Sequence, residues 1–209
     1  MLNAKAKRFF DDLWGQGDPW SFESSAFEQK KYDRQLEMIA DRRYGRALEI
    51  GCGAGVFTRR LAGISDAVVG IDVSQTAIAA ATGRGTPGIT YRAVNVMEYD
   101  PLSESPWDVI VMSETIYYLG WLYPFFDVAW LVGQLFNATR PGGRLLMANT
   151  FGQEHDYLLR PWILQSYRDL FVNVGFQVEH AELFRGIKND VELESQLTLF
   201  VRTSAAGLN

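Results

Sequence analysis

A glycine-rich segment with an acidic residue downstream is the pattern in this sequence best suited to hold a ligand. The letters LEIGCGAGV at residues 48–56 follow an apolar run and open a helical pattern. A tight turn of this kind lets a ligand approach bare backbone N–H groups. Asp72 comes 21 residues after Gly51, at the end of the next apolar run, where its carboxylate can bind both hydroxyls of a ribose. Together these features predict a site for a nucleotide-type cofactor.

The spacing of the glycines separates two classes of nucleotide site. Dinucleotide folds use the pattern G-x-G-x-x-G, but the glycines here stand at 51, 53 and 55, and Val56 occupies the place of the last one. This spacing disfavours a nicotinamide-dependent dehydrogenase. A turn without a ligand is the alternative, and the strand before, the helix after and the acid at the right distance argue against it.

A second group of chemically capable side chains is expected near the ends of later strands. Glu114 can anchor an amine through its carboxylate, or it can be a solvated or capping group. Tyr117 and Tyr118 offer flat faces and phenol hydroxyls that suit a sugar ring, or they can pack in the core. His155 can carry a proton away from an acceptor, or it can be an exposed loop residue.

Aromatic residues crowd the segment 117–130, which contains both candidate tyrosines. Its first part, 117–125, contains Gly120 and Pro124 and follows a predicted parallel strand, at the end where open α/β sheets bind ligands. Phe126 and Trp130 fall inside a predicted helix, and we expect them to pack in the core.

Alternating apolar runs and helical patterns predict the framework that positions these residues. Buried strands alternating with helices indicate a parallel sheet covered on both faces. Two later runs alternate with period two and indicate an antiparallel pair, joined by a short Gly-Ile-Lys-Asn-Asp connection. The expected strands are 46–50, 67–72, 89–94, 107–112, 143–149, 176–184 and 195–202, and the expected helices include 54–62, 74–83 and 122–138.

Residues 1–45 differ in pattern from the rest, and we expect them to form an N-terminal helical lid or cap. They hold a glycine-containing loop at 15–19 with aromatic residues on both sides. Ser25 and Glu28 form a capping box, which predicts that a helix begins there. Residues 46–209 are expected to form the catalytic α/β core of a single domain spanning 1–209.

Composition excludes several other classes of protein. Among 209 residues, 20 Lys and Arg stand against 25 Asp and Glu, and the formal charge of -5 argues against a nucleic-acid partner. One cysteine and two histidines do not make a metal cluster, so we expect no metal. No signal peptide or membrane-spanning run is evident. These features predict a cytoplasmic protein without a membrane partner, for which a monomer is plausible.

The motifs resemble those of the class I S-adenosylmethionine-dependent methyltransferases. The E-x-G-C-G-x-G loop, the G-I-D-x-S segment at 70–74, the W-D-V-I strand at 107–110 and the P-G-G turn at 141–143 follow the order of that family, across about residues 44–202. The resemblance implies an α/β, Rossmann-like sheet of strand order 3-2-1-4-5-7-6 with strand seven antiparallel. It also implies S-adenosylmethionine as the cofactor and S-adenosylhomocysteine as its product.

The resemblance assigns cofactor contacts to particular positions. It places the glycine loop at the methionine moiety and Asp72 at the ribose. Asn95 stands where the family reads adenine and often has Asp, and Ser113 is expected to offer its backbone to the methionine amine. Trp20 and Arg34 can close over the cofactor and meet its carboxylate, or they can be lid packing or a surface pair. The full set of expected cofactor residues is Glu49, Gly51, Gly53, Gly55, Asp72, Val73, Asn95, Val96, Ser113, Trp20 and Arg34.

Two further segments, 18–32 and 113–118, resemble the nodulation protein S methyltransferases. That likeness implies N-methylation of the free amino group on the terminal glucosamine of a deacetylated chitooligosaccharide, in the synthesis of a nodulation signal. The alternatives are an N- or O-methyltransferase of another small molecule and, from a different class, a non-catalytic cofactor-binding protein. From their positions at the strand ends, Glu114 and His155 are expected to serve catalysis, and Tyr117 and Tyr118 to bind the substrate.

Overall fold

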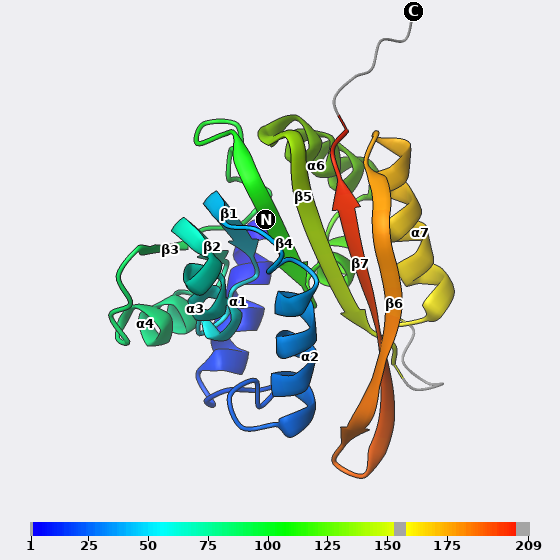
Figure 1. The fold of residues 1–209 in the computed structure, drawn as a ribbon. Coiled ribbons are helices and arrows are strands. Elements are labelled where there is room, and N and C mark those ends of the chain that lie inside the picture. Colours follow the sequence, from blue (N-terminus) through cyan, green and yellow to red (C-terminus); the bar gives the residue numbers. More distant parts are fainter. Residues whose placement is uncertain (1, 153–157, 204–209) are drawn as a thin grey trace, which may run out of the picture. The chain divides into compact units, whose positions relative to one another are not determined.

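The computed structural model describes residues 2–152 and 158–203 (Figure 1). The chain divides into two compact units. The first comprises residues 1–99 and 186–192, and the second comprises residues 100–185 and 193–209.

The first unit consists of three parallel strands with helices packed on them. β1 pairs with β2 and β2 with β3, as in the register Leu48↔Val69 and Val69↔Thr90. α3 packs on these strands, α4 packs on β2 and β3, and α1 contacts α4. The elements are α1 (Leu2–Trp14), α2 (Ala26–Glu37), β1 (Tyr44–Ile50), α3 (Val56–Ile64), β2 (Ser65–Asp72), α4 (Gln75–Thr82) and β3 (Ile89–Ala93).

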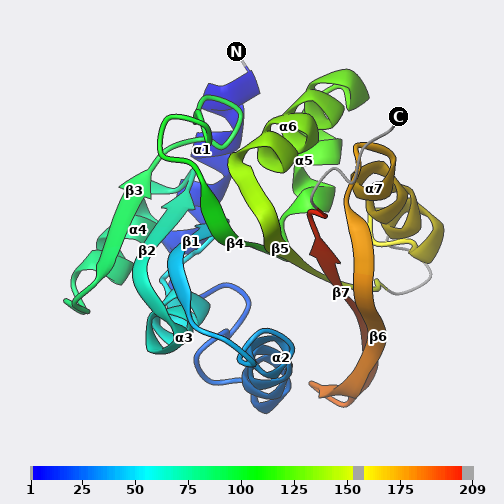
Figure 2. The same ribbon diagram turned by 45° about the horizontal axis from the view of Figure 1, so that its top comes forward.

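In the second unit, parallel and antiparallel strand pairs meet at β5. β4 runs parallel to β5, and β7 pairs with β5 antiparallel, as in Leu146↔Leu199. α5, α6 and α7 contact one another and lie on one face of β5, β7 and β6 (Figure 2). The elements are β4 (Trp107–Ser113), α5 (Ile116–Leu122), α6 (Phe125–Ala138), β5 (Thr139–Thr150), α7 (Pro161–Asn173), β6 (Gln177–Lys188) and β7 (Val191–Val201).

The seven strands follow the order β3-β2-β1-β4-β5-β7-β6, which confirms the expected fold class and the antiparallel β7. The β6–β7 connection is tighter than expected, because only Asn189 and Asp190 lie between the strands. Both have positive φ, 51° and 61°, which is typical of a two-residue hairpin turn whose twist matches that of the strands.

Two predictions about the helices need correction. The helix expected at 122–138 is two helices, because the chain is extended at Tyr123 and Pro124. Phe126 and Trp130, expected in the core, are 75% and 64% exposed. The buried stripe of α6 is formed instead by Val128, Leu131, Val132, Leu135 and Ala138, and residues 126 and 130 lie on another face at a spacing of one turn.

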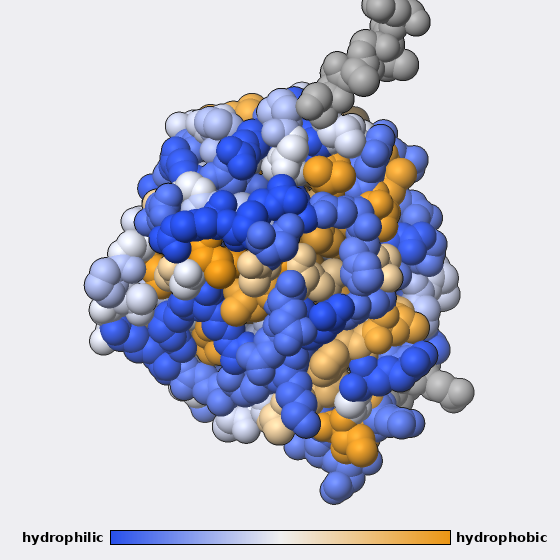
Figure 3. Space-filling view, viewed as in Figure 1, coloured by the Kyte–Doolittle hydropathy of each residue, from blue (hydrophilic) through white to orange (hydrophobic). Residues whose placement is uncertain are grey.

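The first helix, α1, is also a structural finding, since the sequence predicted a lid or cap there without a helix at 2–14. β6 lies at the end of the strand order and keeps apolar side chains at the surface, visible as patches along the strand in Figure 3. These are Val178, Leu183 and Ile187. Charged neighbours such as Glu179 and Arg185 interrupt the apolar run, as is common on edge strands.

Candidate functional site

The glycine loop between β1 and α3 requires glycine for both conformational and steric reasons. Gly51, Gly53 and Gly55 have φ of 76°, 52° and 75°, in the left-handed region that other residues rarely adopt. A Cβ on Gly53 would lie 2.7 Å from Cζ2 of Trp14, and a Cβ on Gly55 would collide with the hydroxyl of Tyr91. The loop backbone therefore lies close to the side chains of Trp14 and Tyr91, with no room for a Cβ at positions 53 and 55.

Backbone hydrogen bonds tie this loop to the end of β2. The amides of Gly51 and Cys52 donate to the carbonyl of Ile71 at 2.8 and 3.0 Å. The amide of Gly53 donates to Oδ2 of Asp72 at 2.9 Å. The first-turn amides of α3 have no acceptor within their own helix and remain suited to a polar ligand group.

The Asp72 carboxylate is held from two sides and keeps acceptor capacity. Besides the bond from Gly53, its Oδ1 accepts from the amide of Ser74 at 2.9 Å. Burial raises the pKa of the carboxyl, and hydrogen bonds from the backbone amides of Ser74, Gly53 and Val73 oppose that rise. A carboxylate offers about four acceptor positions, so about one remains for a hydroxyl of a ribose. The geometry at this strand end fits a nucleoside-type cofactor.

Glu49 supports the loop from below as a buried acid. It is 3% exposed, and its Oε2 accepts from Oγ1 of Thr58 on α3 at 2.5 Å. Burial raises the pKa of Glu49 to about 8, and the nearby charge of Asp72 adds to the rise. The carboxyl is therefore mostly protonated at neutral pH and links β1 to α3. Direct contact between Glu49 and a cofactor stays a prediction.

The sequence analysis missed the contribution of α1 to this site. Oδ1 of Asp11 accepts from Oγ of Ser74 at 2.8 Å and from the amide of Thr76 at 3.2 Å, so α1 supplies a carboxylate to the N-terminus of α4. Trp14, 7% exposed, packs beside Gly53. Asp11 and Trp14 stand three residues apart and share a face of α1, a signal visible only once a helix is assigned there.

Trp20 is held by contacts within the first unit. Its ring stacks on Phe22 at a centroid distance of 5.5 Å and meets Trp14 edge-on at 5.9 Å. Its carbonyl accepts from Nζ of Lys188 at 2.8 Å, and the same ammonium pairs with Oε1 of Glu28 at 2.6 Å. The ion pair connects the N-terminal segment to the tip of the β6–β7 hairpin.

Two arginines of the first unit, Arg34 and Arg59, have different partners. Nη1 of Arg34, which was expected to meet the cofactor carboxylate, pairs with Oε2 of Glu37 at 3.0 Å on the same helix. Nη1 of Arg59 donates to the carbonyl of Ala54 at 3.0 Å, so Arg59 contacts the glycine loop. Arg59 also lines a cavity of about 320 Å³ beside the start of α3. A cofactor contact from Arg34 or Trp20 stays a prediction.

Asn95 and Val96 follow β3 as expected and are both 7% exposed. Oδ1 of Asn95 accepts from the amide of Met97 at 3.0 Å, which fixes the side chain in a local turn and leaves its oxygen a second lone pair. Val73, between Asp72 and Ser74, is partly exposed. Adenine recognition by this segment stays a prediction.

In the second unit, Ser113 is the last residue of β4 and begins a polar corner. The Ser113 side-chain oxygen is buried and has no hydrogen-bond partner among the residues that the structure describes. Glu114 follows with φ of 55°, unusual for a residue with a side chain, and its amide donates to the carbonyl of Ala148 at 2.8 Å.

The Glu114 carboxylate is bound by three donors. Oε2 accepts from the amide of Thr150 at 3.0 Å and from the hydroxyl of Tyr117 at 3.2 Å. Oε1 accepts from Oγ1 of Thr150 at 2.5 Å, and this hydroxyl in turn meets Oγ of Ser195 at 2.8 Å. Thr150 and Ser195 are functional candidates that the sequence analysis missed.

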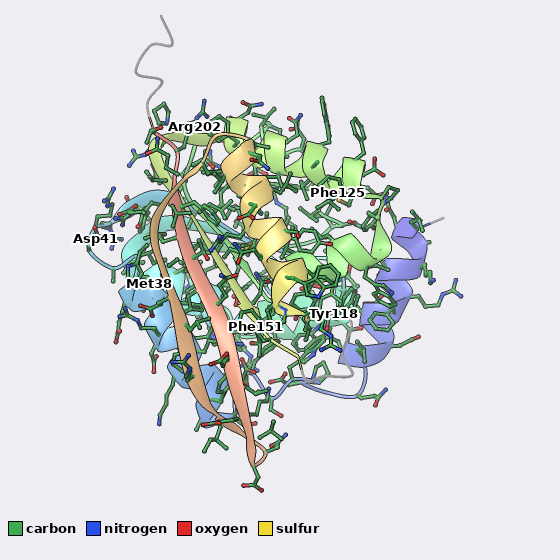
Figure 4. The ribbon with its side chains drawn as sticks, turned by 90° about the vertical axis from the view of Figure 1, so that its right-hand side faces the viewer. Met38, Asp41, Tyr118, Phe125, Phe151 and Arg202 are labelled. Carbon is green, nitrogen blue, oxygen red and sulfur yellow. The ribbon has the colours of Figure 1, made fainter. Side chains whose placement is uncertain are left out.

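The two candidate tyrosines lie together on α5, with ring centroids 4.6 Å apart. Tyr117 is 7% exposed, and Tyr118, labelled in Figure 4, is partly exposed. Burial and the neighbouring Glu114 carboxylate raise the pKa of Tyr117 well above its usual range. His155 lies outside the described residues.

Within residues 2–152 and 158–203, no group of three or more His, Cys, Asp or Glu side chains is placed to hold a metal ion. No helix in the same part of the chain is long and apolar enough to cross a membrane. The thiol of Cys52 is buried inside the glycine loop, and burial raises its pKa well above the usual range.

Comparison with known proteins identifies the family of this chain. The family model of nodulation protein S (NodS) matches residues 4–138. Nodulation protein S of Rhizobium tropici is 33% identical over 148 residues, which cover 69% of this chain and 58% of that protein. The homologue from Sinorhizobium fredii is 31% identical over 151 residues, 69% of this chain and 64% of the relative. The matched part therefore spans about three fifths of the length of these relatives.

Solved structures agree on the fold. The crystal structure of N-methyltransferase NodS from Bradyrhizobium japonicum WM9, in complex with S-adenosyl-L-homocysteine, has a TM-score of 0.80. It is 21% identical, and the match covers 95% of this chain and 99% of that one. The seven-stranded sheet is thus the class I methyltransferase fold. Because the family model matches well over half of the chain, the protein belongs to the nodulation protein S (NodS) family.

Proposed function

We propose that the protein is an S-adenosylmethionine-dependent methyltransferase that acts on an amine. The observation that carries this proposal is the glycine loop, whose Gly53 amide is tied to Asp72 at the end of β2. In this arrangement the first-turn amides of α3 can donate hydrogen bonds to a ligand, and the Asp72 carboxylate can accept hydrogen bonds from it. A ligand with polar groups at both ends fits such a site. Membership of the NodS family supports the same proposal.

In this proposal, different residues of the first unit bind different parts of the cofactor. Asp72, with Val73 beside it, binds the ribose hydroxyls, and the loop at Gly51, Gly53 and Gly55 lies against the methionine moiety. Asn95 and Val96 contact the adenine. Trp20 and Arg34 are the other proposed contacts from this unit, with Glu49 buried beneath the loop, and Ser113 is a proposed contact from the second unit. When bound, S-adenosylmethionine supplies a methyl group that its sulfonium has already activated.

For the acceptor, we propose the free amino group of the terminal glucosamine of a deacetylated chitooligosaccharide. Tyr117 and Tyr118 offer flat faces for the apolar faces of a sugar ring and hydroxyls for its polar edge. Glu114 supplies a fixed negative charge beside them, which favours an amine over an anionic acceptor. The family relationship to NodS proteins supports this acceptor.

The chemistry demands little of the protein beyond alignment. Methyl transfer is an in-line displacement, so the chain must hold the amine lone pair toward the methyl carbon and keep it unprotonated. A positive charge nearby lowers the pKa of an ammonium group, so a strong general base is not required. Glu114 orients the amine in this proposal, and His155 receives the proton.

Two measurements test the proposal. Calorimetry with S-adenosylhomocysteine and with NAD separates the cofactor classes, and only the first is expected to bind. A methyl-transfer assay then compares a chitooligosaccharide with a free terminal amine against the same oligosaccharide N-acetylated at that position. We expect methylation of the free amine alone. Absence of S-adenosylhomocysteine binding contradicts the methyltransferase proposal, and methylation only of other small molecules contradicts the proposed acceptor.

A further inference from the structure

For each hydrogen bond around Glu114, the donor and the acceptor can be assigned from the chemistry of the groups. An ionised carboxylate only accepts hydrogen bonds, so the hydroxyl proton of Tyr117 points toward Glu114. The hydroxyl proton of Thr150 also points toward Glu114. Because Thr150 has used its only hydroxyl proton, the contact between Thr150 and Ser195 must have Ser195 as the donor.

This direction leaves the Tyr117 oxygen without a proton to give, so the neighbouring Tyr118 hydroxyl can only donate to it. A hydroxyl oxygen has two lone pairs, and the second is left for another donor. We infer that Tyr117 accepts an N–H of the acceptor amine, and that Thr150 and Ser195 are positioning residues that hold Glu114 so that the hydroxyl keeps this polarity. The inference rests on the function proposed above. It adds the specificity rule for the acceptor site, namely that the nucleophile must bring a hydrogen-bond donor.

The rule has a mechanistic reason. A neutral amine that attacks a methyl carbon points its lone pair at that carbon, and its N–H groups point elsewhere and need acceptors. A hydroxyl free to turn would instead donate to the lone pair and weaken the nucleophile. With its proton held by Glu114, Tyr117 orients the N–H and leaves the lone pair exposed. A carboxylate or phenolate acceptor offers no donor to Tyr117 and meets the charge of Glu114.

The backbone at Glu114 supports this assignment. A left-handed conformation is unfavourable for a residue with a side chain, and Glu114 holds it at φ of 55°. The bond from its amide to Ala148 and the two bonds from Thr150 keep the carboxylate in one place. Glu114 therefore faces Tyr117 with its position set by β5, and Ser195 on β7 supports Thr150 in turn.

Matched variants of Thr150 test the positioning role with the full chain. Thr150→Val removes the hydroxyl and keeps the size and the backbone amide, whereas Thr150→Ser keeps the hydroxyl. We expect Thr150→Val to lower kcat for the amine about tenfold, while KM and the affinity for S-adenosylhomocysteine change less than about threefold. Thr150→Ser should restore kcat to within about twofold of the parent. Equal kcat for the Val variant and the parent overturns the inference.

Glu114→Gln tests the polarity itself. The amide NH₂ of glutamine donates to the Tyr117 oxygen and turns the hydroxyl proton outward, so amine methylation should fall about a hundredfold or more. In Tyr117→Phe, amine methylation should fall at least about tenfold, because the oxygen that accepts the N–H is gone. A Glu114→Gln protein that is folded by circular dichroism and methylates at the parental rate contradicts the inference.

A spectroscopic measurement keeps the inference testable without turnover. The ¹³Cζ signal of Tyr117, assigned with the Tyr117→Phe variant, reports the titration of its hydroxyl. In Glu114→Gln this titration should move to lower pH, because the charge that opposes ionisation is removed. If the parent methylates no amine, the proposed function fails while this shift still supports the hydrogen-bond chain. An unchanged titration shows that Glu114 does not hold the Tyr117 proton.

Discussion

The corners after β1 and β4 both have left-handed backbone, and they are built in opposite ways. The loop after β1 uses glycine at each of its three left-handed positions and is held by backbone amides and Asp72. The corner after β4 has Glu114 in the left-handed conformation, which is unfavourable for a residue with a side chain. Hydrogen bonds from Thr150 hold the Glu114 carboxylate.

The difference shows how two kinds of binding site can arise. A site made of backbone groups needs residues without side chains, and its shape follows from a few adjacent letters. A site made of side chains needs partners from elsewhere in the fold. Thr150 lies 36 residues from Glu114, and Ser195 lies 45 residues beyond Thr150. The site made of backbone groups can accommodate a cofactor of fixed shape. The site made of side chains can be adapted to an acceptor by changing one hydroxyl group.

The largest effect is expected at the glycine loop. Gly53→Val should lower the affinity for S-adenosylhomocysteine more than about a hundredfold, because the side chain meets Trp14 and disfavours the left-handed backbone. Gly85→Val is the matched control. Gly85 has φ of 53°, and a Cβ there would meet no atom of the described chain within 4 Å. Calorimetry should show near-parental binding for the control, and equal losses in both variants would mean that backbone strain alone matters.

Asp72→Ala should produce the next largest loss. Removing its carboxylate should cost about 1.5–3 kcal/mol of cofactor binding, or about ten- to a hundredfold in affinity. Asp66→Ala, on the same strand but exposed and paired with Arg43, is the control and should bind as the parent does. Calorimetric binding of S-adenosylhomocysteine to the Asp72 variant at parental affinity would remove Asp72 from the cofactor site.

The Glu114 corner is tested by comparing two left-handed residues. Glu114→Gly relieves the backbone but removes three hydrogen bonds, so the free energy of unfolding should fall by about 2 kcal/mol. Asp190→Gly, at φ of 61° in the hairpin turn, should change it by less than about 0.5 kcal/mol. Urea unfolding measures both. A stabilised Glu114→Gly protein would show that the carboxylate contributes less than the backbone strain.

The effect that depends on pH concerns the buried acid beneath the glycine loop. The pKa of Glu49 is about 8 in the folded chain and about 4.3 in an unfolded one. The folded state therefore binds a proton that the unfolded state releases. This contribution to stability is complete below about pH 4 and is lost as the pH rises through 8.

Glu49→Gln mimics the protonated acid and should remove this loss. Relative to the variant, the parent should lose about 1 kcal/mol of unfolding free energy per pH unit between about pH 5 and 8. Denaturant unfolding at several pH values measures the difference. A constant difference between parent and variant would show that Glu49 does not take up a proton on folding.

The regions of the molecule differ in how far the sequence predicted them. The glycine pattern and the change from buried to alternating strands are local signals, whereas the strand order was implied by the resemblance to class I methyltransferases, and the structure confirms it. The same local reasoning failed at α6. A crowd of aromatic residues predicted burial for Phe126 and Trp130, but helical phase places them on a face other than the packed stripe.

The sequence by itself determined the fold class and the conformation of the glycine loop, because both depend on hydrophobic periodicity and on residues that tolerate positive φ. Only the tertiary structure decided which polar side chains meet. Asp11 reaches Ser74 across 63 residues, and Arg59 donates to the carbonyl of Ala54 in the glycine loop. Glu114 meets Thr150 only because β4 and β5 are neighbours. Hydrogen bonds act over a few ångströms, so packing rather than spacing in the chain selects the partners.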